Sequence, residues 1–140
     1  VLALSREATM SQAAFDPYIS EPGIFTTKVR MVGTGASAPT KTAEVDAPNV
    51  TITRPSGAGQ YRLTFADNPG LWCGPKGLPG LQAATPGDIK GMVVIVGPFT
   101  AATADADAYV DLYVYDGGSA HDLAASEWIT VDLDFRRARS

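Results

Sequence analysis

Hydrophobic and polar residues alternate along much of the chain with a period of two, which is typical of β-strands. The alternation is clearest in residues 60–65, 109–116 and 127–137, and shorter versions occupy residues 25–32 and 49–53. A period of two places the apolar side chains on one face of each strand. The pattern therefore predicts sheets that bury one face and expose the other.

Two segments depart from this alternation. Residues 92–99, with the sequence MVVIVGPF, form a continuous apolar run rich in β-branched side chains. Such a run favours a central strand buried on both faces. A helical period appears only in residues 5–15, SREATMSQAAF.

Glycine and proline mark the turns between the predicted strands. PSGAG at residues 55–59 predicts a hairpin loop in which Gly57 and Gly59 adopt positive φ. Residues 66–80 are rich in Gly and Pro and predict no long regular element. Residues 100–108 predict a loop, and residues 116–126 a turn that ends in one helical turn.

Six or seven short strands without a βαβ rhythm predict an all-β protein, an antiparallel β-sandwich or jelly-roll spanning residues 24–140. Residues 1–23 lie outside the strand pattern and predict an extended N-terminal arm. The arm carries Phe15, Tyr18 and Ile19 between prolines and glycine. These apolar side chains either reach onto a neighbouring chain or fold back across their own sandwich.

Composition excludes some classes of partner. Of 140 residues only 19% are charged, and the net charge is −4, which argues against nucleic acid or an anionic membrane. No apolar stretch approaches the ~18 residues that span a bilayer. The first ten residues predict no signal peptide, and Met10 is a second candidate for the start of the chain.

Candidate chemistry is sparse. Cys73 is the single cysteine, which excludes an intrachain disulfide. We expect a partly buried small hydrophobe there, with a reactive or intermolecular thiol as the alternative. His121 is the single histidine and precedes Asp122, but no nucleophile-elbow motif accompanies the pair. We therefore expect a loop residue with local hydrogen bonds, no catalytic set, no cofactor and no metal.

Acidic residues gather between residues 105 and 134. Calcium prefers several oxygen ligands from loops, yet the run lacks the spacing and closing glutamate of an EF-hand. No two acids are selected as the pair of a glycosidase. A solvated strand face is the simpler interpretation.

Three stretches carry a resemblance to a known family. They are GAGQYRLTFADNPG, LQAATPGD, and AYVDLYVYDGGSAHDLAASEWITVDLDFRRARS. Together they cover about residues 49–140, and they resemble small virion proteins of tailed bacteriophages. Size and predicted fold are similar to those of the capsid cement (decoration) proteins of phage heads, among them the jelly-roll cementing protein of Bordetella-type podophages.

The resemblance implies a structural protein on the outside of the virion capsid, made in the bacterial cytoplasm. It would clamp adjacent major capsid protein subunits against the internal DNA pressure, as a homodimer in preference to a trimer. Candidate interface residues, inferred from this sequence alone, are Phe15, Tyr18, Ile19, Phe25, Trp72, Arg136 and Arg137. Trp72 equally fits the open end of its own sandwich.

The alternative is a carbohydrate- or receptor-binding β-sandwich module of a phage tail. It would use Trp72, Tyr113 and Tyr115 as sugar platforms, together with calcium held by the acidic run.

Overall fold

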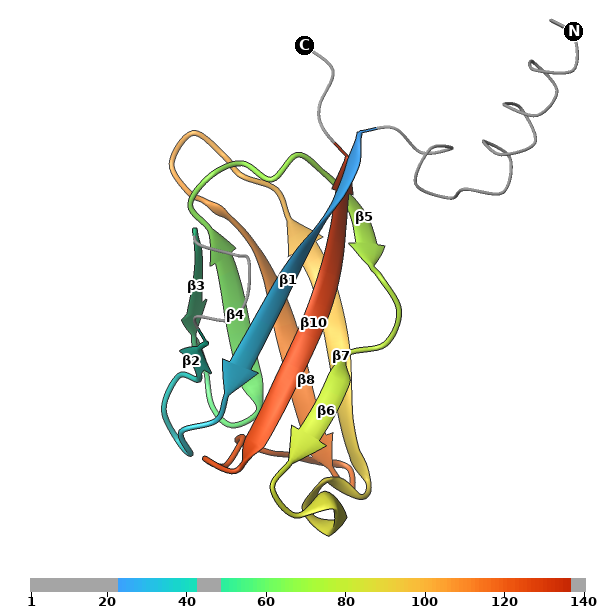
Figure 1. Ribbon diagram of the computed structural model, residues 1–140. Coiled ribbons are helices and arrows are strands. Elements are labelled where there is room, and N and C mark those ends of the chain that lie inside the picture. Colours follow the sequence, from blue (N-terminus) through green and yellow to red (C-terminus); the bar gives the residue numbers. More distant parts are fainter. Residues whose placement is uncertain (1–22, 43–48, 137–140) are drawn as a thin grey trace, which may run out of the picture.

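A computed structural model describes residues 23–42 and 49–136. These residues form two antiparallel sheets packed face to face, so the predicted all-β sandwich is confirmed (Figure 1). The predicted arm and its helical period lie outside the described residues, apart from Gly23. The first sheet has the order β2-β1-β10-β5, with β6 also paired to β10, and the second has the order β3-β4-β8-β7, with β9 paired to β8.

Strand β10 (Glu127–Arg136) is the centre of the first sheet. One side of β10 pairs with β1 (Ile24–Val32) along its whole length. The other side pairs with two short strands in succession, β5 (Leu71–Pro75) and β6 (Gly80–Ala83). Strand β2 (Thr40–Lys41) extends the sheet beyond β1.

Two hairpins make the second sheet. Strands β3 (Val50–Thr53) and β4 (Gln60–Phe65) form one hairpin. Strands β7 (Met92–Thr100) and β8 (Ala108–Asp116) form the other, and β4 joins β8. A 3₁₀ turn, η1 (Pro86–Ile89), precedes β7, and the short strand β9 (Ser119–Ala120) follows β8.

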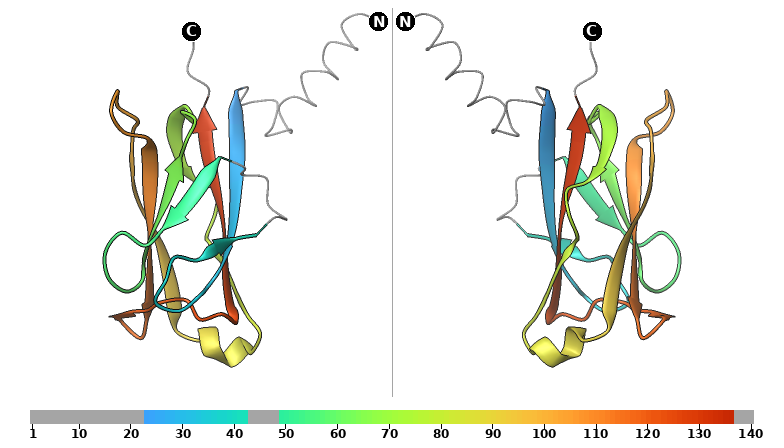
Figure 2. Two further views of the ribbon diagram at one scale, coloured as in Figure 1. Left: turned by 90° about the vertical axis from the view of Figure 1, so that its left-hand side faces the viewer. Right: turned by 90° about the vertical axis from the view of Figure 1, so that its right-hand side faces the viewer.

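The core lies between the sheets and follows the alternation in the sequence. Side chains at every second position of β4, β8 and β10 point inward and are buried, which is the expected result of a two-residue period. The largest fully buried side chains include Tyr61, Leu63, Leu112 and Phe135. Figure 2 shows the two sheets edge-on, with β1 and β10 in one layer and β4 and β8 in the other.

Residues 92–99 correct the sequence prediction. They form most of β7, which is an edge strand and not a central one. Its inward side chains are buried or half-buried, whereas Val93 and Ile95 are 51% and 49% exposed. A continuous apolar run indicates that both faces of the strand are apolar, but it does not indicate that other parts of the protein cover both faces.

Three smaller expectations can be compared with the structure. The hairpin loop has Gly57 at φ 61° and Gly59 at φ 71°, as predicted. The segment 66–80 was expected to be irregular, yet it contains β5 and the first residue of β6, because β10 supplies partner backbone that the sequence does not reveal. The helical turn expected at the end of residues 116–126 is not formed, since residues 121–124 have no regular secondary structure and residues 125–126 form a turn.

Candidate functional site

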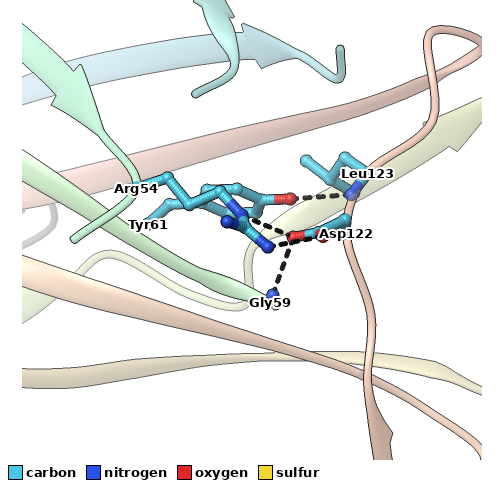
Figure 3. A network of polar contacts seen from close by, with 5 residues as sticks. All are labelled: Arg54, Gly59, Tyr61, Asp122 and Leu123. Carbon is cyan, nitrogen blue, oxygen red and sulfur yellow. Dashed lines mark hydrogen bonds and ion pairs between the residues drawn. The ribbon is translucent and has the colours of Figure 1, made fainter. Parts of the chain in front are cut away.

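A network of polar contacts joins the β3–β4 hairpin to the segment after β9 (Figure 3). Arg54 follows β3 and binds both carboxylate oxygens of Asp122, Nε to Oδ1 at 3.0 Å and Nη2 to Oδ2 at 2.8 Å. The backbone N–H of Gly59 donates to the same Oδ1 at 2.9 Å. The hydrogen bond from Arg54 holds the pKa of Asp122 below its ordinary value.

Tyr61 continues the network into the core. Its hydroxyl accepts a 2.7 Å hydrogen bond from the backbone N–H of Leu123, and both residues are fully buried. Burial raises the pKa of Tyr61, because the ionised phenolate would lose its hydration. A phenol held neutral in this way acts as a fixed acceptor and offers no base to a substrate.

The same segment is tied to the first sheet. The N–H of Gly35 donates to the carbonyl of Leu123 at 2.9 Å, and Gly33 donates to Glu127 at 3.0 Å. A Cβ on Gly33 would lie 2.2 Å from the carbonyl oxygen of Ala124. Residues 121–127, which we call the clamp segment, therefore bond to both sheets and connect them at one end.

His121 and Asp122 do not form a catalytic dyad. The ring Nε2 of His121 lies 2.9 Å from Oε1 of Glu127, and the same oxygen accepts from the N–H of Ala124 at 2.6 Å. Asp122 meanwhile binds Arg54. This geometry is that of the local loop role expected for His121, and it serves the clamp segment.

A second ion pair lies on the outer face of the second sheet. Arg62 binds Asp111 through two contacts, Nε to Oδ1 at 2.8 Å and Nη2 to Oδ2 at 3.0 Å. The guanidinium also lies 3.8 Å from the centre of the Tyr109 ring. The carboxylate of Asp111, which is only 8% exposed, therefore has its charge balanced by the guanidinium of Arg62.

The acidic residues do not converge. Within residues 23–42 and 49–136, no group of three or more His, Cys, Asp or Glu side chains is arranged to hold a metal ion. Asp111 and Asp122 bind arginines, and Asp134 accepts from the Thr26 hydroxyl at 2.6 Å. The long-range arginine partners were missed from the sequence, since Arg54 and Asp122 are 68 positions apart.

Of the predicted interface residues, two lie in an aromatic cluster of the sandwich. Trp72 stacks on Phe99 with ring centres 5.2 Å apart, and Phe25 stacks on Phe135 at 5.9 Å. Trp72 is half-buried between β5 and β7, which is the place expected of a residue that closes its own sandwich. It is therefore separate from Tyr113 and Tyr115, which lie on the outer face of the second sheet.

The remaining interface predictions fall at or beyond the chain ends. Arg136 is exposed and ends β10, in register with Ile24 and Leu71. Phe15, Tyr18, Ile19 and Arg137 lie outside the described residues.

Cys73 corrects a further expectation. The alternation of β5 turns Trp72 toward the core and Cys73 away from it, so the thiol is exposed and not partly buried.

The exposed large apolar side chains come from the edge elements of the two sheets. In the part of the chain that the structure describes, the large hydrophobic residues that stand exposed are Leu71, Leu78, Val93 and Ile95, with Leu78 95% exposed. All four belong to β5, the loop after it, or β7, which are the edge elements on the same side of the two sheets (Figure 1). Leu71 alternates with the inward Trp72 and faces outward from the first sheet, whereas Val93 and Ile95 face outward from the second. These exposed positions beside the two edge strands are the strongest candidates for binding another protein.

Comparisons with known protein families, curated proteins and solved structures found no match. Among the described residues, no helix is long and apolar enough to cross a membrane.

Proposed function

We propose that the protein is a structural component of a tailed-phage virion that binds the outer surface of the head and clamps adjacent major capsid protein subunits. The observation that carries the proposal is the exposure of Leu71, Leu78, Val93 and Ile95 on the edge elements of the two sheets. Large apolar side chains on an edge are typical of surfaces that another protein covers. The resemblance of residues 49–140 to small virion proteins supplies the kind of partner.

The polar clusters support the same proposal. In each of the pairs Arg54–Asp122 and Arg62–Asp111, the arginine and the carboxylate balance each other's charge. The first pair connects the clamp segment to the β3–β4 hairpin. Side chains that are already held in such pairs lose little conformational entropy when the protein binds a partner. The apolar surface that each copy buries on a head would stabilise the shell by about 25 cal/mol per Å². This stabilisation would be repeated at every equivalent site.

The test uses heads of the phage that carries the gene for this chain. Purified protein is mixed with expanded heads and with unexpanded proheads, and bound protein is measured after sedimentation. We expect saturable binding to expanded heads and a higher disruption temperature of those heads. Leu78→Asp should weaken binding, whereas Thr53→Asp, an exposed change at the opposite edge, should not. Absence of binding to both kinds of head would contradict the proposal.

One observation favours the glycan-binding alternative. Tyr109, Tyr113 and Tyr115 lie at alternate positions of β8 and share the outer face of the second sheet. Aromatic faces of this kind stack on sugar rings. A glycan array, with Tyr113→Ala as the comparison variant, would separate this function from head binding, and a chelator would show whether a cation takes part.

A further inference from the structure

The outer edge of β7 has no strand beside it among the described residues, although its sequence is strongly β-forming. The order β3-β4-β8-β7 puts β7 at the end of the second sheet. Such an edge exposes a row of backbone donors and acceptors that can pair with another chain. The question is which backbone groups point outward.

Three hydrogen bonds answer it. The N–H of Gly117 donates to the carbonyl of Gly91, so Gly91 faces β8. Val114, the β8 residue opposite Val94, instead bonds to Gly59 and His121 on its far side. In an antiparallel ladder the bonded pairs alternate. Val93 and Ile95 therefore bond to β8, and the backbone groups of Met92, Val94 and Val96 point outward.

The other edges of the sandwich are short or blocked. Strand β2 has only two residues. At the edge of β3, the ammonium of Lys41 bonds to the carbonyl of Val50 at 2.8 Å. The opposite edge of the first sheet is divided between β5 and β6, with Pro75 at the end of the first stretch of pairing and Pro79 between the two stretches. Prolines and lysines are common means of keeping an edge unpaired.

Strand β7 carries such protection only in its second half. The register shifts between Val96 and Phe99, and Pro98 lies inside that irregularity. Residues 92–96 contain no charge, proline or glycine. They leave five regular residues of uncharged strand available for pairing.

The side chains of this segment are self-complementary. Val93 and Ile95 are about half exposed and lie one on each side of Val94. On the next strand they are in register with Tyr115 and Tyr113. The ion pair on this face, Arg62 with Asp111, carries no net charge. A twofold contact brings each group near its own equivalent, so an uncharged surface suits a second copy better than a charged partner.

We infer that two copies of the chain pair through β7, antiparallel, about a twofold axis at Val94. The outward backbone groups of Val94 then bond to those of Val94 in the second copy, and Met92 bonds to Val96 of the second copy in the same way. Val93 lies directly opposite Ile95 of the second copy, on the outer face. The two five-stranded sheets become one continuous sheet of two copies, crossed by rows of tyrosine and β-branched side chains.

This inference names the interface of the homodimer that the resemblance to phage cement proteins implies, and it requires nothing about binding to heads. It also divides the exposed apolar residues between two tasks. Val93 and Ile95 are covered in the dimer, while Leu71 and Leu78 stay free for the shell.

The test is a pair of full-length charge variants examined by light scattering. One carries Val93→Glu with Ile95→Glu, and the other carries Val93→Lys with Ile95→Lys. We expect the wild type to have the mass of two chains, each variant alone the mass of one, and an equal mixture the mass of two. The control, Thr51→Glu with Thr53→Glu on the same outer face at the β3 edge, should stay dimeric.

Amide hydrogen exchange of the wild type gives an independent measurement. The amides of Val94 and Val96 should be protected from exchange at concentrations where the dimer forms. When either charged variant is measured alone, the amide of Val94 should lose this protection, while the amide of residue 95 keeps it. A monomeric wild type, charged variants that remain dimeric, a mixture that fails to associate, or an unprotected Val94 amide would each overturn the inference. A β7 dimer that ignores heads would contradict the proposed function alone, and a monomer that binds heads would contradict only the dimer.

Discussion

The hydroxyl of Tyr61 accepts a hydrogen bond from the backbone N–H of Leu123, 62 positions away, at a place where neither residue meets solvent. Tyr61 belongs to the middle of the second sheet, and Leu123 to the clamp segment that also binds the first. The two sheets are therefore joined by a directional bond as well as by apolar packing.

Tyr61→Phe should remove this bond and leave the Leu123 N–H buried without a partner. An unsatisfied buried donor costs about 1–3 kcal/mol, so we expect the free energy of unfolding to fall by that amount in a urea titration. Tyr115→Phe, on the outer face, serves as the control and should change it by less than about 0.5 kcal/mol. Equal effects would mean that the Leu123 N–H finds another partner.

Asp122 should make the fold sensitive to acid. Its pKa is lowered in the folded protein by Arg54, so its contribution to stability is complete above the pKa of the unfolded chain, about 3.9. That contribution is lost as pH falls through the lower, folded-state value. Asp122→Asn should reduce stability at neutral pH and flatten the decline below about pH 4. Thermal unfolding across pH, with the exposed loop change Asp105→Asn as reference, measures the difference.

Two glycines of one hairpin loop offer a matched comparison. Gly57 and Gly59 both have positive φ, but a Cβ on Gly57 would meet nothing within 4 Å, whereas one on Gly59 would lie 2.5 Å from the carbonyl oxygen of Val114. Gly57→Ala should cost about 1–2 kcal/mol from backbone conformation alone. Gly59→Ala should cost clearly more, because the clash is with backbone atoms. Similar unfolding free energies for the two variants would show that the loop shifts without resistance.

Cys73 should react in the folded protein. Its side chain is exposed on β5 and is oriented away from the aromatic cluster. A thiol-specific chromogenic reagent should modify it completely in buffer, at a rate close to that in denaturant. Slow modification that speeds up only on unfolding would mean that the thiol is covered in solution.

The alternation in residues 60–65, 109–116 and 127–137 was sufficient to predict the strands and the buried face of each. The position of a strand within its sheet was not predictable in the same way, as residues 92–99 show. A strand's neighbours depend on long-range pairing, and the sequence of β7 is apolar on both faces whether or not another strand covers it. Strands β5 and β6 were missed for the complementary reason, since their pairing depends on β10 more than on their own composition.

The candidate surface was predictable only in part. Phe25 was predicted as an interface residue, and Trp72 either as an interface residue or as a residue that closes the open end of its own sandwich. Their stacking on Phe135 and Phe99 could not be predicted without the fold. The exposed Leu78 gave no sequence signal beyond its place among glycines and prolines. The Arg54–Asp122 pair gave none, because a single arginine and a single aspartate 68 positions apart show no spacing pattern.

The central place of β10 has a consequence for synthesis. Strands β3, β4, β7 and β8 can pair as soon as residue 116 has left the ribosome. In contrast, β5 and β6 have no strand partner, and β1 has only the two residues of β2, until residues 127–136 follow. A nascent chain therefore holds one finished sheet whose apolar face is bare, and the cell's chaperones and proteases meet it in that state. Translation that stops before Glu127 yields a product open to degradation, so only chains that extend through β10 can accumulate.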